Sequence, residues 1–186
     1  LARWAIRNLD KLPAGLEPGL SATASLDGPP DGVYANAVQA AVVEIDGETG
    51  KLKLRRFVVV EDCGTIINPT IVEGQTRGGV VQGIGSALFE RIVYDGEGQP
   101  LTTNFADYMM PLATEIPEIE VHHIQTPSPF TQLGIKGVGE GGAIGAAAAV
   151  ANAVADALGV GVAETPFTPA RLLDLVESEE RVPAQA

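Results

Sequence analysis

The chain has 186 residues, of which 22 are glycine and one is cysteine, and its formal charge is −12 at pH 7. Only residues 51–56 cluster basic side chains, and phosphate binding needs such clusters, so we expect no nucleic-acid partner. A single cysteine, Cys63, cannot form an internal disulfide or hold an iron–sulfur cluster, and it suits a reducing, cytoplasmic location.

The first third of the chain predicts a leading segment followed by a hairpin. Residues 1–32 begin with a short helical pattern and then become rich in glycine and proline, which is typical of turns. From Val33 to Val60, two apolar β-branched runs flank the charged, glycine-rich residues 46–50. This pattern predicts two antiparallel strands joined by a hairpin loop.

Two further strands are predicted downstream, at residues 90–94 and 119–125, and both would extend the sheet. The only histidines, His122 and His123, are adjacent in the second of these strands. Neighbouring residues of a strand point to opposite faces, so the two imidazoles cannot share a metal ion. We therefore expect no metal held by protein ligands.

Three helices are predicted. A cap residue followed by proline opens segments 68–89 and 168–177, and this pair of residues is typical of a helix start. A third helix is expected over 141–158, because Gly159 provides a natural C-terminal stop. Strands and helices cluster instead of alternating strictly, which favours the α+β class.

The domain organisation follows from these elements. We expect residues 1–32 to lead into one domain over 33–177, with a tail at 178–186. The weakly polar stretch 143–163 is mostly alanine and glycine and contains an asparagine and an aspartate, so it is a poor membrane span. We expect no membrane partner.

The first glycine cluster lies in the helix predicted over 68–89. At 100° per residue, Gly74, Gly78 and Gly85 fall in one narrow arc, with Gln82 beside it. Each interior glycine costs about 1 kcal/mol of helix stability relative to alanine, so something should approach the backbone closely. That partner is either another helix or a rigid ligand to which the Gln82 amide offers a donor and an acceptor.

The second glycine cluster, residues 136–143, opens the helix expected over 141–158. Three of its glycines match the G-x-G-x-x-G pattern. A dinucleotide site is disfavoured, because the preceding segment is turn-like and Glu140 puts a carboxylate where pyrophosphate would need backbone N–H groups. Glu140 is either a first-turn carboxylate favoured by the helix dipole or a general base around which the glycines clear space.

Together the motifs resemble a known family. The runs at 60–69 (VEDCGTIINP), 73–75 (EGQ), 79–85 (GVVQGIG) and 136–140 (KGVGE) resemble the large, molybdopterin-binding subunit of the molybdenum hydroxylases, which include xanthine, aldehyde, nicotinate-type and aerobic carbon monoxide dehydrogenases. Their order and separation match over residues 34–175. The resemblance covers only the C-terminal portion of that subunit, and it implies the corresponding molybdopterin-binding fold.

The resemblance also implies a function for individual residues. Glu140 would be the active-site base of a hydroxylase or dehydrogenase that oxidises an aldehyde or a heteroaromatic substrate with oxygen from water. Gln82 would contact the molybdenum–pterin centre. Gly83, Gly139 and Lys136 would lie on the cofactor side of the site.

The implied cofactor is a molybdopterin-type molybdenum group, as the plain pterin or the cytosine dinucleotide form, shared with the remaining segments of the molybdenum subunit. Iron–sulfur and FAD groups would belong to partner subunits, so neither would be bound by this chain. The alternative interpretation is a non-catalytic structural module of the same fold that contributes only an assembly surface.

Overall fold

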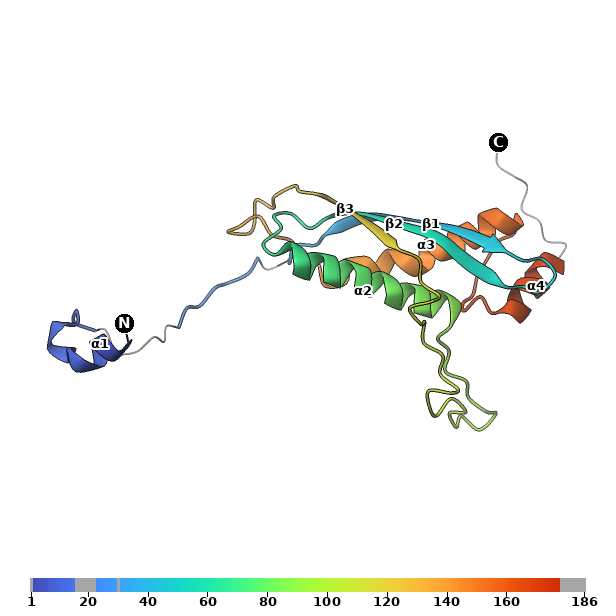
Figure 1. Cartoon of the computed structure of the whole chain (residues 1–186), viewed down its shortest axis with the longest axis horizontal. Coiled ribbons are helices and arrows are strands. Elements are labelled where there is room, and N and C mark those ends of the chain that lie inside the picture. The colour runs from blue at the N-terminus through green and yellow to red at the C-terminus, as the bar shows by residue number, and fades with distance from the viewer. Residues whose placement is uncertain (1, 16–22, 30, 178–186) are drawn as a thin grey trace.

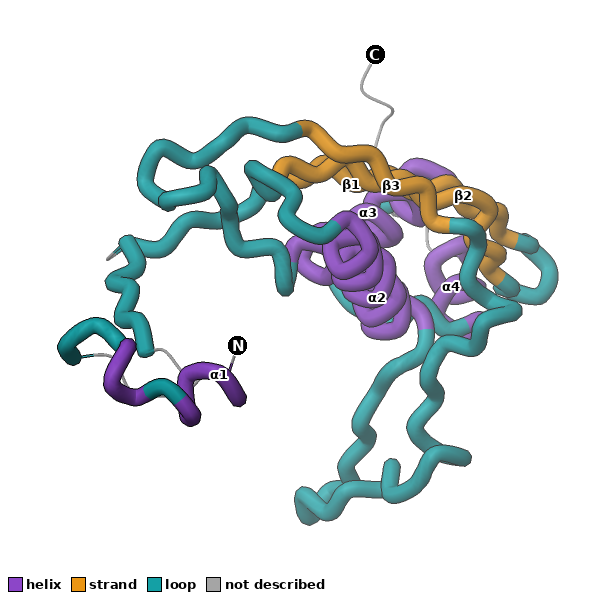
Figure 2. Tube along the Cα trace, turned by 60° about the vertical axis from the view of Figure 1, so that its left-hand side comes forward, coloured by secondary structure: helices purple, strands orange, loops and turns teal. Residues whose placement is uncertain are grey.

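The computed structural model describes residues 2–15, 23–29 and 31–177. A three-stranded sheet is covered on one face by two long helices, α2 and α3 (Figures 1 and 2), and the predicted α+β class is confirmed. The elements in chain order are α1 (Ala2–Arg7), η1 (Leu9–Lys11), β1 (Asn36–Ile45), β2 (Leu52–Asp62), α2 (Pro69–Leu88), β3 (Ile119–Ile124), α3 (Gly141–Leu158) and α4 (Pro169–Glu177).

The predicted hairpin is confirmed, and β3 joins it in parallel. β1 and β2 pair antiparallel, with Ala41 opposite Phe57. The carboxylate of Asp46 closes the turn by accepting hydrogen bonds of 2.9 and 3.0 Å from the backbone N–H groups of Glu48 and Thr49. β3 pairs parallel to β2, with Ile119 opposite Phe57. A parallel neighbour requires a long crossover connection, and α2 with the segment after it supplies that connection.

The strand predicted at residues 90–94 is wrong. Residues 90–118 form an arm that extends away from the sheet and helices (Figures 1 and 2). Its hydrogen bonds are local: the Leu101 N–H donates to the Val93 carbonyl at 2.7 Å, and Tyr94 forms an isolated bridge with Pro100. A short hairpin without a packed face does not propagate into a sheet. The arm exposes the large apolar side chains of Ile92, Tyr94, Leu101, Phe105, Met109, Met110 and Leu112.

Helices α2 and α3 lie side by side and run in the same direction (Figure 1). A Cβ at Gly79 would lie 2.9 Å from the Ala143 nitrogen, and one at Gly83 would lie 2.5 Å from the Ala146 Cβ. Alanine at either position would therefore collide with the facing helix. The helix–helix alternative is thus correct for this pair of glycines.

The glycines of the predicted arc behave differently. A Cβ at Gly74 or Gly78 would meet nothing within 4 Å, whereas one at Gly85 would meet the Glu90 carboxylate and Pro111. The close approach of α3 thus occurs one residue away from Gly78, on the neighbouring helix face. Within the described residues no helix packs against Gly74 or Gly78, so for these two glycines the ligand alternative stays a prediction.

The core lies between the sheet and the two long helices. Its fully buried side chains come from β2, α2, α3 and α4 and include Phe57, Val59, Val80, Ile84, Val150, Val154 and Leu172. By length and composition alone α3 could cross a membrane. Its fully buried residues pack into this core, and a core helix accounts for the same composition.

The two classes of glycine in α2 should respond oppositely to alanine. We expect Gly83→Ala to lower the free energy of unfolding by about 1–3 kcal/mol, because the added methyl overpacks the contact with α3. Gly78→Ala, the matched control, should raise it by about 0.5–1 kcal/mol through helix propensity. Urea unfolding followed by circular dichroism measures both; equal effects of the two substitutions would contradict the assignment of glycines to packed and open faces.

Candidate functional site

The loop that leads to Glu140 is fastened to the ends of two strands. The backbone N–H of Lys136 donates to the Cys63 carbonyl at 2.9 Å, just beyond β2. Gly137 exchanges backbone hydrogen bonds with the segment before β1, donating to Val33 at 2.8 Å and accepting from Ala35 at 3.0 Å. The loop therefore has a fixed place relative to the sheet.

Glu140 itself stands at the start of α3. Its backbone carbonyl accepts hydrogen bonds from the N–H groups of Ala143 (3.0 Å) and Ile144 (3.2 Å), which begins the helix. Its side chain is exposed and makes no capping hydrogen bond. The carboxylate is thus held through its backbone and is open to a ligand, near the positive end of the helix dipole.

The outward face of α2 lies beside this loop. Gln75, Gly78 and Gln82 are spaced by three and four residues and are all exposed, so they share one face of the helix. A Cβ at Gly139 would lie 3.8 Å from the Gln75 Nε2. The amide that flanks the Glu140 loop is therefore Gln75, and Gln82 lies two turns, roughly 10 Å, further along the helix axis.

Gln75 was absent from the predicted site residues. Its seven-residue spacing from Gln82 could have indicated it, because residues i and i+7 of a helix share a face. The structure thus brings Gln75 to Gly139, the residue before Glu140. Gly83 lies instead in the contact between α2 and α3, where Ala146 covers it.

Lys136 is held in an ion pair. Its side chain is 12% exposed, and its Nζ lies 3.2 Å from Asp62 Oδ1. The same oxygen accepts hydrogen bonds from the N–H groups of Gly64 (2.9 Å) and Thr126 (3.0 Å). The hydrogen bonds from Thr126, followed by that from Gly64, hold the pKa of Asp62 well below its ordinary value. Asp62 therefore joins the end of β2 to the loops at 126 and 136.

Protein ligands for a metal do not gather in the described ranges. Within residues 2–15, 23–29 and 31–177, no group of three or more His, Cys, Asp and Glu side chains could hold a metal ion. Cys63 is buried, and burial raises the pKa of its thiol, which disfavours the reactive thiolate. The groups available near Glu140 are backbone amides, side-chain amides and one carboxylate.

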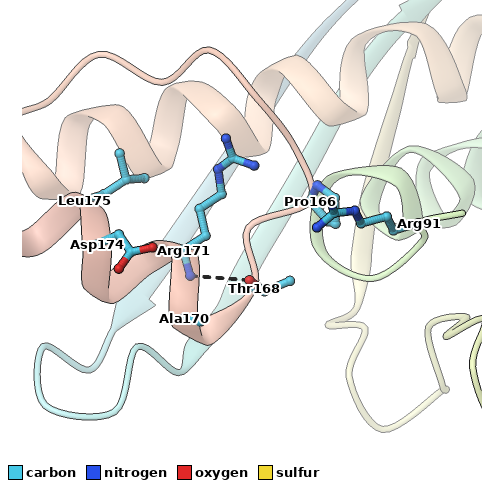
Figure 3. Close-up of a pocket in the computed structure, with 7 residues that line it drawn as sticks. All are labelled: Arg91, Pro166, Thr168, Ala170, Arg171, Asp174 and Leu175. Atoms are coloured by element: carbon cyan, nitrogen blue, oxygen red, sulfur yellow. Dashed lines mark hydrogen bonds between the residues drawn. The ribbon is translucent and has the colours of Figure 1, made fainter. Parts of the chain in front are cut away.

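A pocket of about 410 Å³ lies elsewhere, at α4 (Figure 3). Its polar lining includes Arg91, Asp174 and Arg171, whose backbone N–H donates to the Thr168 hydroxyl at 3.3 Å. The start of α4 packs against Gly50 in the β1–β2 turn, at the opposite end of β2 from the Glu140 loop. The pocket contains none of the predicted site residues.

Comparison with known proteins gives consistent matches. A family model described as a molybdopterin cofactor-binding domain matches residues 2–117. The nicotine 6-hydroxylase large subunit of Paenarthrobacter nicotinovorans is 51% identical over 166 residues, 88% of this chain and 20% of that protein. The carbon monoxide dehydrogenase large chain of Hydrogenophaga pseudoflava is 42% identical over 163 residues, 86% of this chain and 20% of that protein.

A solved structure also matches. The quinoline 2-oxidoreductase structure from Pseudomonas putida 86 superposes with a TM-score of 0.82 at 44% identity, covering 93% of this chain and 22% of that one. The chain thus spans about one fifth of the length of these relatives.

The Asp62 junction predicts a pH-dependent stability. A carboxylate whose pKa is lowered on folding stabilises the fold above its ordinary pKa of 3.8 and loses that contribution as the pH falls towards its folded pKa. We expect Asp62→Asn to be less stable than the wild type at pH 7, with a difference that shrinks below pH ~4. Urea unfolding at several pH values measures this, and exposed Asp10→Asn, the control, should match the wild type throughout. A pH-independent difference would contradict the assigned role of the carboxylate.

Proposed function

The chain belongs to the molybdopterin cofactor-binding family of molybdenum hydroxylase large subunits, and on that premise we propose that Glu140 is the base of a site that oxidises an aldehyde or a heteroaromatic substrate. The observation that carries the proposal is the setting of Glu140: an exposed carboxylate without a capping hydrogen bond, on a loop fastened to two strand ends. A general base needs this combination of fixed position and open access.

The residues beside Glu140 fit a cofactor that brings its own metal ligands. Gly74 and Gly78 leave the outward face of α2 bare, although each interior glycine costs about 1 kcal/mol relative to alanine. No contact within the described chain requires them, so a rigid group from outside is expected to lie there. Gln75 and Gln82 on the same face offer amide donors and acceptors, which suit a pterin. Because these are amide and backbone groups, the ligands of the metal would come from the cofactor itself.

The roles in the reaction follow from this arrangement. When bound, the molybdenum cofactor supplies the redox chemistry by taking the two electrons that leave the substrate carbon, while the oxygen comes from water. Glu140 accepts a proton at its carboxylate. Gln75 and Gln82 orient the cofactor through their amides, and the backbone of Gly139 allows it to approach the loop closely.

The substrate class is proposed from the relatives. Their names refer to nicotine, quinoline and carbon monoxide, and the first two are nitrogen heteroaromatics. Because the chain spans only about one fifth of these proteins, we propose that the rest of a large subunit completes the site. Iron–sulfur and FAD subunits would carry the electrons away, and the cofactor would be the plain pterin or the cytosine dinucleotide form.

Replacing the proposed base should abolish turnover. In the large subunit assembled with its partner subunits, we expect Glu140→Gln to lower kcat by about 10²–10⁴-fold, the usual contribution of a general base. Dye reduction with a panel of nicotine, quinoline and aldehydes identifies the substrate and then measures the loss.

The same substitution at the hairpin tip, Glu48→Gln, is the matched control and should leave kcat unchanged. Retention of kcat within a few-fold in the Glu140→Gln enzyme would show the base assignment to be wrong. If assembly changed instead, the non-catalytic module would be the better interpretation.

The two amides of α2 should matter for cofactor retention. Removing a hydrogen-bonding partner from a buried polar group costs about 1–3 kcal/mol, so Gln75→Ala and Gln82→Ala should each lower the molybdenum content of the purified enzyme. Elemental analysis per subunit measures the loss. Gln99→Ala, on the arm, is the control; equal molybdenum content in all variants would contradict the placement of the cofactor on this face.

A further inference from the structure

A carboxylate lies buried beneath the turn that carries Glu140. Glu61, near the end of β2, is 0% exposed, and its Oε2 accepts a hydrogen bond of 2.6 Å from the Thr76 hydroxyl of α2. Its other oxygen, Oε1, is buried without a hydrogen-bond partner in the described part of the chain. Nor does any described lysine or arginine form an ion pair with it. Burying an unpaired carboxylate lowers the stability of the fold. An apolar side chain would therefore give a more stable fold if the residue at position 61 served only to fill space.

The unpartnered oxygen faces the start of α3. Gly141 is the first residue of α3, and a Cβ added to it would overlap Glu61 Oε1. The first N–H groups of a helix carry partial positive charge, so Oε1 lies at the positive end of α3. Gly141 directly follows Glu140 in the chain, so a side chain at position 141 would force Glu61 or the turn to shift.

Other elements hold the same turn. Gln39 of β1 donates through Nε2 to the carbonyl oxygens of Gly141 (2.9 Å) and Gly142 (3.1 Å). On β3, His123 is the register partner of Glu61, and its ring nitrogens are buried without partners. The first turn of α3 thus rests on a polar layer at the end of the sheet, and Glu61 is the member that also links it to α2.

We propose that Glu61 is a positioning residue that fixes the turn 139–142 and thereby presents Glu140. The proposal rests on the function assigned to Glu140 above. Glu140 makes no capping hydrogen bond, so the backbone alone sets its place, and glycines flank it on both sides. Glycine is the least restrained residue, whereas a catalytic group must be held within about 0.5 Å. Restraint must therefore come from outside the turn, and Glu61 supplies it from β2 by packing against Gly141, beside the hydrogen bonds from Gln39.

The test uses the large subunit assembled with its partner subunits. Glu61→Gln keeps the size of the side chain but replaces one carboxylate oxygen with an NH2 group. That group would face either the start of α3 or the Thr76 hydroxyl. Thr76→Val removes the hydroxyl and keeps the shape. Glu48→Gln at the hairpin tip is the matched control. Hydrogen exchange of the amides of residues 137–144 is measured by mass spectrometry, together with kcat, KM and molybdenum content.

We expect Glu61→Gln and Thr76→Val to raise exchange about tenfold or more, confined to residues 137–144. Misplacing a catalytic group by about 1 Å costs on the order of 10²-fold, so kcat should fall by up to that factor while KM and molybdenum content stay near the wild-type values. Unchanged exchange in both variants would overturn the proposal, and so would faster exchange throughout α2, α3 and the sheet, which would indicate a merely structural role.

The base assignment is tested separately. If Glu140→Gln kept its turnover, the function proposed for Glu140 would fail, and with it the catalytic part of this proposal. Local loosening of the turn in the Glu61→Gln enzyme would still show which residue holds it. The two failures can therefore be told apart, because hydrogen exchange tests the role of Glu61 and turnover tests the role of Glu140.

Discussion

The close contact between α2 and α3 is the constraint on which the rest of the structure depends. The two backbones can approach only because Gly79 and Gly83 on α2 face Ala143 and Ala146 on α3 without intervening side chains. Since the helices run in the same direction, this contact brings the start of α3 to the N-terminal half of α2 and to the end of β2. The position of the loop at Gly139 beside Gln75 is a direct consequence of that packing.

Glycines serve two separate purposes in α2, and composition alone cannot distinguish them. Gly79 and Gly83 are required by the fold, because any side chain there would collide with α3. Gly74 and Gly78 are not required by any contact within the described chain, although they weaken the helix. Because packing within the described chain does not explain this loss of helix stability, we assign these glycines to the contact with the proposed cofactor.

Local sequence rules predicted the elements that end in a cap or a turn. The Asn68 cap, the Gly159 stop and the Asp46 turn gave α2, α3 and the hairpin with accurate bounds. Such rules fail where contacts between residues far apart in the sequence determine the structure of a segment. Residues 90–94 have strand-like composition but find no neighbouring strand, and which face of α2 meets α3 depends on packing that periodicity does not encode. The spacing of Gln75 from Gln82 places both on one face of α2, but the contact with Gly139 is what shows that Gln75 is the amide beside the Glu140 loop.

The way Glu140 is held suits the proton transfer that we propose for it. Hydrogen bonds donated to a carboxylate stabilise its charged form and oppose proton uptake; Asp62, which receives three such donors, is fixed in that form and serves as a junction. Glu140 is placed instead by backbone hydrogen bonds of its loop and by the polar layer beneath α3. Side-chain hydrogen bonds are thus concentrated one layer below the proposed base, where they fix the turn and leave the Glu140 carboxylate open to a ligand.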